Sequence, residues 1–162
     1  MEEYVRDAQR GDPAAMSVVL DHLARRLGRV CGAIALDRGD DALQETLLVV
    51  LRNLVNLREP AALYSWARRI AVRESLRIVT GSRDLPVAEF TELVSNDIDV
   101  PLGTDVRAVL ATLSPTHRAV LVLRHVEDLS EEQVADHMGV TVGTVKSRTS
   151  RAKEAFVARW NQ

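Results

Sequence analysis

The sequence predicts an all-α fold in which two helical modules are joined by an acidic linker. Apolar residues in the first half of the chain recur at spacings of three and four, the period of an amphipathic helix, and no segment alternates every second residue as a strand would. Residues 84–105 carry six acidic and no basic side chains, together with two prolines and one glycine. We therefore expect one module at residues 1–83, a linker at 84–105 and a second module at 106–162.

The composition favours a globular protein and argues against a disulfide-bonded, zinc-binding or membrane-spanning one. The chain has 162 residues, of which 46% are hydrophobic and 27% charged, as in a globular protein with one domain or two small ones. Cys31 is the only cysteine, which excludes an internal disulfide and a cysteine-based zinc site, and the four histidines lack metal-ligand spacing. The sequence shows neither a signal-peptide pattern nor a membrane-spanning apolar run. We expect a cytoplasmic protein with no metal, no cofactor and no membrane partner.

Helix boundaries in the first module follow from capping residues. Asp12 precedes a proline and is a typical N-cap, and Gly39 closes that first helix or the turn after it. Asp41 with Gln44 matches a capping box that opens a second helix. A third helix is expected at about residues 61–79.

The second module is expected to contain helices at about residues 104–113, 115–126, 130–137 and 141–158. Ser114 and Ser130 are good helix starts. A turn at Gly139 separates the last two helices, and small apolar residues on both sides can hold them at a steep angle. This pattern is typical of a helix-turn-helix, whose second helix enters the DNA major groove.

The last expected helix carries a basic face. Between residues 141 and 160 the chain has five basic side chains and one acidic side chain. Small hydroxyl residues let a helix approach base edges, while long basic side chains reach guanines or phosphates. A solvated helix face is the alternative, but the preceding helix and glycine turn favour DNA binding. The candidate DNA-binding residues are Thr144, Lys146, Ser147, Arg148, Ser150 and Arg151.

These residues carry a resemblance to a known family. The stretch LSPTHRAVLVLRHVEDLSEEQVADHMGVTVGTVKSRTSRAKEAF strongly resembles region 4, the C-terminal DNA-binding region, of bacterial sigma factors. The likeness is greatest to the extracytoplasmic-function (ECF) group of the sigma-70 family. In the first module, DDALQETLLVVLRNL is similar to region 2.2 of that group, and LYSWARRIAVRESLR to its regions 2.3 and 2.4. The resemblance covers nearly the whole chain.

The resemblance implies a promoter-specificity subunit whose partners are core RNA polymerase and promoter DNA. It places Asp41, Gln44 and Glu45 against the clamp helices of the largest polymerase subunit, with helix capping and surface acids as the alternative interpretation. The helix-turn-helix would read the −35 promoter element. The family also suggests an anti-sigma factor as a further partner. The residues implied near the −10 element are Tyr64, Trp66, Arg69, Arg73 and Arg77, with a core position as the alternative for Trp66.

The first module departs from the family pattern at several positions. Arg73 stands where members usually have Asn, and Arg77 stands near their usual Asp. The consecutive arginines that often follow are replaced by IVTGSR, and Ala67 replaces the leucine that usually follows the tryptophan. Fewer cations after Arg77 should weaken contact with the −10 element.

Three functions from different classes remain open for this sequence. The first is an initiation factor, and the second is a sigma-like decoy that binds polymerase or a regulator without opening promoters. The third is an enzyme, which is disfavoured because the sequence contains no His-Glu metal pair, nucleophile motif or phosphate-binding glycine loop.

Overall fold

The computed structural model describes residues 1–81 and 103–161, and within these ranges the chain forms helices and turns with no strand. The all-α prediction is confirmed. The expected linker at 84–105 falls almost wholly outside the described residues. Its last two positions already belong to a helix, which begins at Thr104.

The N-terminal part is built from α1 (Glu2–Gln9), α2 (Pro13–Ala35), α3 (Gly39–Asn53) and α4 (Leu63–Thr80). Short 3₁₀ turns at Leu36–Arg38, Leu54–Asn56 and Pro60–Ala62 connect the longer helices. The sequence analysis did not predict α1, although its Val5 and Ala8 are buried. The N-cap at Asp12 is confirmed, because its side chain accepts a hydrogen bond of 2.9 Å from the Ala14 amide.

The predicted capping box at Asp41 is wrong. α3 begins two residues earlier, at Gly39, and no side chain caps its N-terminus. The Asp41 carboxylate instead accepts a hydrogen bond of 2.8 Å from Arg38 Nε. The first residue of α3 packs closely against α2, because a Cβ on Gly39 would lie 2.7 Å from the Cα of Gly32. Only glycine therefore fits at this crossing without a backbone shift.

The C-terminal part consists of α5 (Thr104–Ala111), α6 (Pro115–His125), α7 (Glu131–Met138) and α8 (Val142–Trp160), close to the predicted ranges. Both predicted serine caps are confirmed. Ser114 Oγ accepts a hydrogen bond from the His117 amide at 3.3 Å. Ser130 forms a complete capping box with Gln133, with hydrogen bonds of 2.8 and 3.2 Å.

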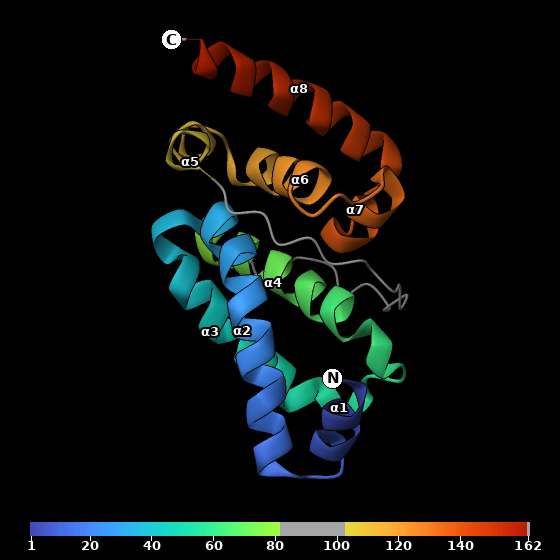
Figure 1. Ribbon diagram of the computed structural model, residues 1–162. Coiled ribbons are helices and arrows are strands. Elements are labelled where there is room, and N and C mark those ends of the chain that lie inside the picture. Colours follow the sequence, from blue (N-terminus) through green and yellow to red (C-terminus); the bar gives the residue numbers. More distant parts are fainter. Residues whose placement is uncertain (82–102, 162) are drawn as a thin grey trace.

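The two parts pack against each other, with the C-terminal helices over α2 and α4 (Figure 1). One apolar cluster lies within α1 to α4 and the segments that join them. The second cluster combines buried residues of α5 to α8 with residues from the other part of the chain. Those contributed by α2 and α4 are Val30, Ala33, Ile34, Val72 and Leu76. The side of α4 that faces α6 and α7 is therefore part of a shared core.

Candidate nucleic-acid interface

α7 and α8 form the predicted helix-turn-helix. Gly139 ends α7 in the left-handed conformation at φ 65°, which glycine adopts without strain. The Val140 amide then donates to the Ala135 carbonyl at 3.0 Å, which reverses the chain between the two helices. Thr141 caps α8, since its Oγ1 accepts from the Thr144 amide at 3.2 Å. Buried Val145 anchors the start of α8 to the core beneath it.

The six candidate residues on α8 lie together and are accessible. Lys146, Ser147, Ser150 and Arg151 are exposed, and the remaining two are partly buried. Lys146 is 63% exposed, and its Nζ lies 3.7 Å from Glu131 Oε2 of α7. At such exposure an ion pair is worth little, so the ammonium group remains available to a ligand.

The candidate residues for the −10 element are mostly buried, unlike the candidate residues on α8. Tyr64, Trp66 and Arg69 are 8%, 5% and 2% exposed. Trp66 lies in the first apolar cluster, which agrees with the core alternative considered for it. Arg73 is partly buried. The Arg77 side chain is 39% exposed and pairs with Glu74 at 2.7 Å. These residues share α4 but do not form a continuous exposed basic face in this conformation.

The candidate polymerase-binding residues lie on the first turns of α3. Asp41 and Gln44 are exposed and Glu45 is partly exposed. Arg77 Nη2 of α4 lies 3.7 Å from Glu45 Oε2, so the structure brings a predicted polymerase residue beside a predicted DNA residue. Because these side chains are exposed or partly exposed, the C-terminal helices that the structure describes do not cover them.

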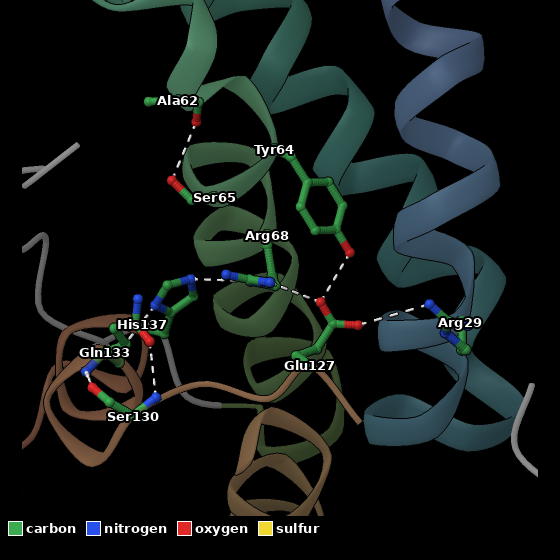
Figure 2. A network of polar contacts seen from close by, with 9 residues as sticks. All are labelled: Arg29, Ala62, Tyr64, Ser65, Arg68, Glu127, Ser130, Gln133 and His137. Atoms are coloured by element: carbon green, nitrogen blue, oxygen red, sulfur yellow. Dashed lines mark hydrogen bonds and ion pairs between the residues drawn. The ribbon is translucent and has the colours of Figure 1, made fainter. Parts of the chain in front are cut away.

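A buried polar network joins the two parts of the chain, and sequence reasoning did not find it (Figure 2). Glu127, which follows α6, accepts hydrogen bonds through Oε2 from Arg68 Nη1 at 2.8 Å and from the Tyr64 hydroxyl at 3.0 Å. Its Oε1 lies 3.9 Å from Arg29 Nη2 of α2. The Arg68 and Glu127 side chains are only 2% and 4% exposed. A buried carboxylate is thus surrounded by donors from α2 and α4.

His137 of α7 completes this network. Arg68 Nε donates to His137 Nε2 at 3.3 Å, and His137 Nδ1 lies 2.8 Å from the Gln133 carbonyl oxygen. Both contacts are satisfied by the neutral ring with its proton on Nδ1. Burial, with the Arg68 charge as the next cause, lowers the pKa of His137 to about 3. Burial also raises the pKa of the Tyr64 hydroxyl, and the Glu127 charge adds to that shift.

Two further contacts cross between the parts. Arg69 pairs with Asp136 of α7. Arg118 of α6 is 5% exposed and donates through Nε to the Ile34 carbonyl oxygen at 2.9 Å. That carbonyl belongs to the last turn of α2, where helical acceptors lack internal donors. The four-residue spacing of Tyr64 and Arg68 places them on one helical face, but no local pattern could identify Glu127 or Asp136 as their partners.

Neither a metal site nor a membrane-spanning helix is found among the described residues. Among residues 1–81 and 103–161, no three His, Cys, Asp or Glu side chains are grouped so that they could hold a metal ion. In the same described ranges, no helix has the length and apolar character required to cross a membrane.

Comparisons with known proteins agree with the resemblance seen in the sequence. Residues 104–156 match the family model for sigma-70, region 4. The RNA polymerase sigma-H factor of Pseudomonas aeruginosa is 30% identical over 175 residues, which cover 96% of this chain and 91% of the relative. The ECF RNA polymerase sigma factor SigE of Mycolicibacterium smegmatis is 31% identical over 161 residues, covering 89% of this chain and 62% of that relative's length.

Solved structures share the fold. CnrH in complex with the cytosolic domain of CnrY superposes with a TM-score of 0.64 at 17% identity, covering 99% of this chain and 96% of that one. The sigma factor RpoE of Bartonella quintana, in complex with the anti-sigma factor NepR, gives a TM-score of 0.54 at 23% identity. The latter match covers 87% of this chain and 91% of that one.

Proposed function

The chain belongs to the ECF group of the sigma-70 family of RNA polymerase sigma factors, and from this premise we propose that it directs core RNA polymerase to specific promoters. In this proposal α8 reads the −35 element, α4 contacts the −10 element and α3 binds the polymerase. Bond formation belongs to the polymerase, and this chain supplies recognition.

One observation carries the proposal: the second helix of a complete helix-turn-helix, α8, presents an exposed face with basic and hydroxyl side chains. Its hydroxyl residues are short enough for close approach to base edges, and Lys146 and Arg151 can reach guanine acceptors in the major groove. Arg148 is partly buried and is suited to a phosphate contact that fixes the register of the helix. The contacts of Ser147 and Ser150 remain within α8, to Thr144 and Glu154.

Polymerase binding is assigned to the beginning of α3. The exposed Asp41 and Gln44 and the partly exposed Glu45 lie close together at the start of α3 and offer acceptors to a basic or polar partner. Arg38 and Arg77 flank these acids, so the surface carries both signs of charge. It lies on α3, whereas the proposed −35 surface lies on α8, so the two sites can be occupied together (Figure 1).

An anti-sigma factor is a further proposed partner. The Bartonella quintana sigma factor with a similar fold was solved with its anti-sigma factor NepR. A protein that covers either α3 or α8 would block one of the two proposed contacts. Such a partner would be identified as a protein that copurifies with the intact chain and whose presence prevents the chain from binding core polymerase.

A sigma-like decoy is the second candidate, and the burial of Arg69 and Trp66 favours it. Strand opening needs a surface that holds unstacked bases through aromatic stacking and cations. In this conformation those two residues are 2% and 5% exposed. A chain that kept this conformation on polymerase would bind without opening DNA.

One experiment separates the two candidates. The purified chain is added to core polymerase and a negatively supercoiled promoter library, and transcripts and permanganate-reactive thymines are mapped. An initiation factor gives promoter-dependent transcripts and reactive thymines near the start site, in a salt-sensitive manner. Upstream protection without reactive thymines on any promoter would establish the decoy. Core polymerase without the chain is the control.

A further inference from the structure

α2 carries a row of basic side chains that lies outside the three proposed contact sites. The residues of this row recur at spacings of three and four, so they share one face of the helix. Asp21, at the edge of the row, is the only acidic residue of α2. The row extends over about 10 Å of the helix axis, which gives room for about two or three phosphates of one strand. We call it the α2 basic row, and its members are His22, Arg25, Arg26 and Arg29.

The outer part of the α2 basic row is accessible to a ligand. Arg25 is exposed, and His22 and Arg26 are partly exposed. Among the residues that the structure describes, no acidic side chain pairs with Arg25. The other end of the row is covered, because the Arg29 side chain is 15% exposed and its Nη2 lies 3.9 Å from Glu127 Oε1 (Figure 2). The row therefore extends from the buried polar network to the surface.

The charges of the α2 basic row repel one another. Arg25 and Arg29 are four positions apart, as are His22 and Arg26, and like charges at this spacing destabilise a helix. Burial lowers the pKa of His22, and the charges of Arg26, the N-terminal ammonium group and Arg25 lower it further. The electrostatic potential at the His22 ring is therefore positive. A bound polyanion would relieve this repulsion.

Arg26 connects the α2 basic row to α4. Its guanidinium lies over the Tyr64 ring, 3.8 Å from the ring centroid. A guanidinium stacked on an aromatic face can still donate through its edge to phosphate oxygens. The row thus adjoins the helix to which the −10 contact is assigned.

We propose that the α2 basic row binds phosphates of the same DNA strand that α4 contacts at the −10 element. The inference rests on the proposed function of α4 and deepens it by adding Arg25 and Arg26 as phosphate contacts. Both side chains are accessible in the described conformation, so strand contact begins on α2. The contact of Arg26 with Tyr64 of α4 favours a nucleic-acid strand over an acidic protein segment as the ligand.

The test measures binding of the intact chain to a fluorescent mixed-sequence single-stranded oligonucleotide at low salt. Arg25→Ala should weaken binding about fivefold, because one phosphate contact is lost, and Arg25→Glu should weaken it about tenfold or more. Arg25→Lys should retain most of the affinity, since lysine still supplies a point charge. The matched controls are Arg52→Ala and Arg52→Glu, at an exposed arginine near the end of α3, and their affinities should stay within about twofold of the unmodified chain. Circular dichroism establishes that each variant is folded.

Nuclear magnetic resonance of His22 localises the contact. The pKa of His22 should rise when the oligonucleotide binds, because phosphate charge beside the ring favours the imidazolium. This rise on binding should be lost in Arg25→Glu and retained in Arg52→Glu. A general loss of charge from the chain would affect both variants alike.

The outcomes separate this inference from the proposed function. Equal weakening by Arg25→Glu and Arg52→Glu would overturn the role of the α2 basic row, as would a pKa of His22 that the oligonucleotide leaves unchanged. Polyglutamate that competes as well as the oligonucleotide at equal charge would overturn the assignment to DNA and indicate an acidic protein partner. Specific loss of strand binding in Arg25→Glu, with no transcripts from any promoter with the unmodified chain, would support the row and contradict the initiation factor.

Discussion

Arg68 Nη1 and Glu127 Oε2 are 2.8 Å apart in a buried ion pair, although the two residues are separated by 59 positions in the sequence. The pair connects α4 to the segment after α6. Breaking a buried pair by removing one partner is costly, because the other charge stays desolvated. The accessibility of α4 is therefore coupled to the placement of the whole C-terminal part.

Trp66 should prove to be a core residue in the free chain. Trp66→Ala is expected to lower the free energy of unfolding by about 3–5 kcal/mol, because it leaves a cavity in the first apolar cluster. Urea denaturation followed by circular dichroism measures this change. Trp160→Ala is the control: Trp160 is 52% exposed and stacks on Phe156, so its loss should cost less than about 1 kcal/mol. An unchanged stability in Trp66→Ala, with loss of promoter opening, would instead make Trp66 a base-stacking residue.

Stability should depend on pH through His137. Its pKa is about 3 in the folded chain, below the ordinary 6.5, because burial and the Arg68 and Arg69 charges disfavour the imidazolium. The unfolded chain therefore binds a proton that the folded chain does not. The stability that the neutral His137 contributes to the folded chain is fully present above pH 6.5 and is lost as the pH falls towards 3.

The expected slope is up to about 1.4 kcal/mol per pH unit from this group. The free energy of unfolding is measured by urea denaturation at pH 6.5, 5.5 and 4.5 for the unmodified chain and for His137→Gln. The difference between the two pH profiles is the contribution of His137. The variant should lack this component, whereas His117→Gln, on the partly buried start of α6, should retain it. Parallel pH profiles for the unmodified chain and His137→Gln would contradict the assignment.

Base recognition by α8 should depend on Lys146 and Arg151. Lys146→Ala and Arg151→Ala are each expected to cost about 1–3 kcal/mol of promoter binding if each side chain makes a bidentate base contact. Binding of the polymerase complex to promoter fragments with altered −35 elements measures both affinity and preference. Arg159→Ala, at the last turn of α8, is the control with the same change of charge. Unchanged promoter preference in the double variant would exclude α8 as the recognition helix.

A phosphate contact should behave differently from a base contact. Arg148→Ala is expected to weaken binding to all sequences by a similar factor. It should also reduce the slope of log K against log salt by about 1, because one fewer phosphate is neutralised. A salt titration with two unrelated promoters checks this. A change in preference between those promoters would show that Arg148 reads bases.

Polymerase binding should be lost when the charge on α3 is reversed. Asp41→Arg with Glu45→Arg is expected to reduce association with core polymerase while the chain stays folded, since the exposed pairs to Arg38 and Arg77 contribute little to stability. Gel filtration of mixtures with core polymerase measures the complex. Glu3→Arg with Asp21→Arg, at two exposed positions on α1 and α2, is the control for the same change of net charge. If a fragment without residues 1–83 binds core polymerase as tightly as the whole chain, α3 is not the binding surface.

Local structure was largely predictable because it depends on residues close in sequence. The caps at Asp12, Ser114 and Ser130 and the turn at Gly139 were found from the sequence, since each cap bonds to an amide within three residues. The start of α3 was not found. α3 starts at Gly39 without a side-chain cap and in close contact with Gly32 of α2, a contact between two helices that capping rules do not contain.

The sequence by itself determined the helices from α2 to α8 apart from the start of α3, together with the helix-turn-helix and the exposed basic face of α8, because helical period, capping and local charge are encoded within a few residues. Only the tertiary structure decided that Tyr64, Arg68 and Arg69 are covered. Arg68 meets Glu127 and His137 across 59 and 69 positions, and Arg69 meets Asp136 across 67. A spacing of four on α4 fits an exposed DNA-binding face and a buried one equally well. The helices that pack against α4 decide whether this face is exposed or buried.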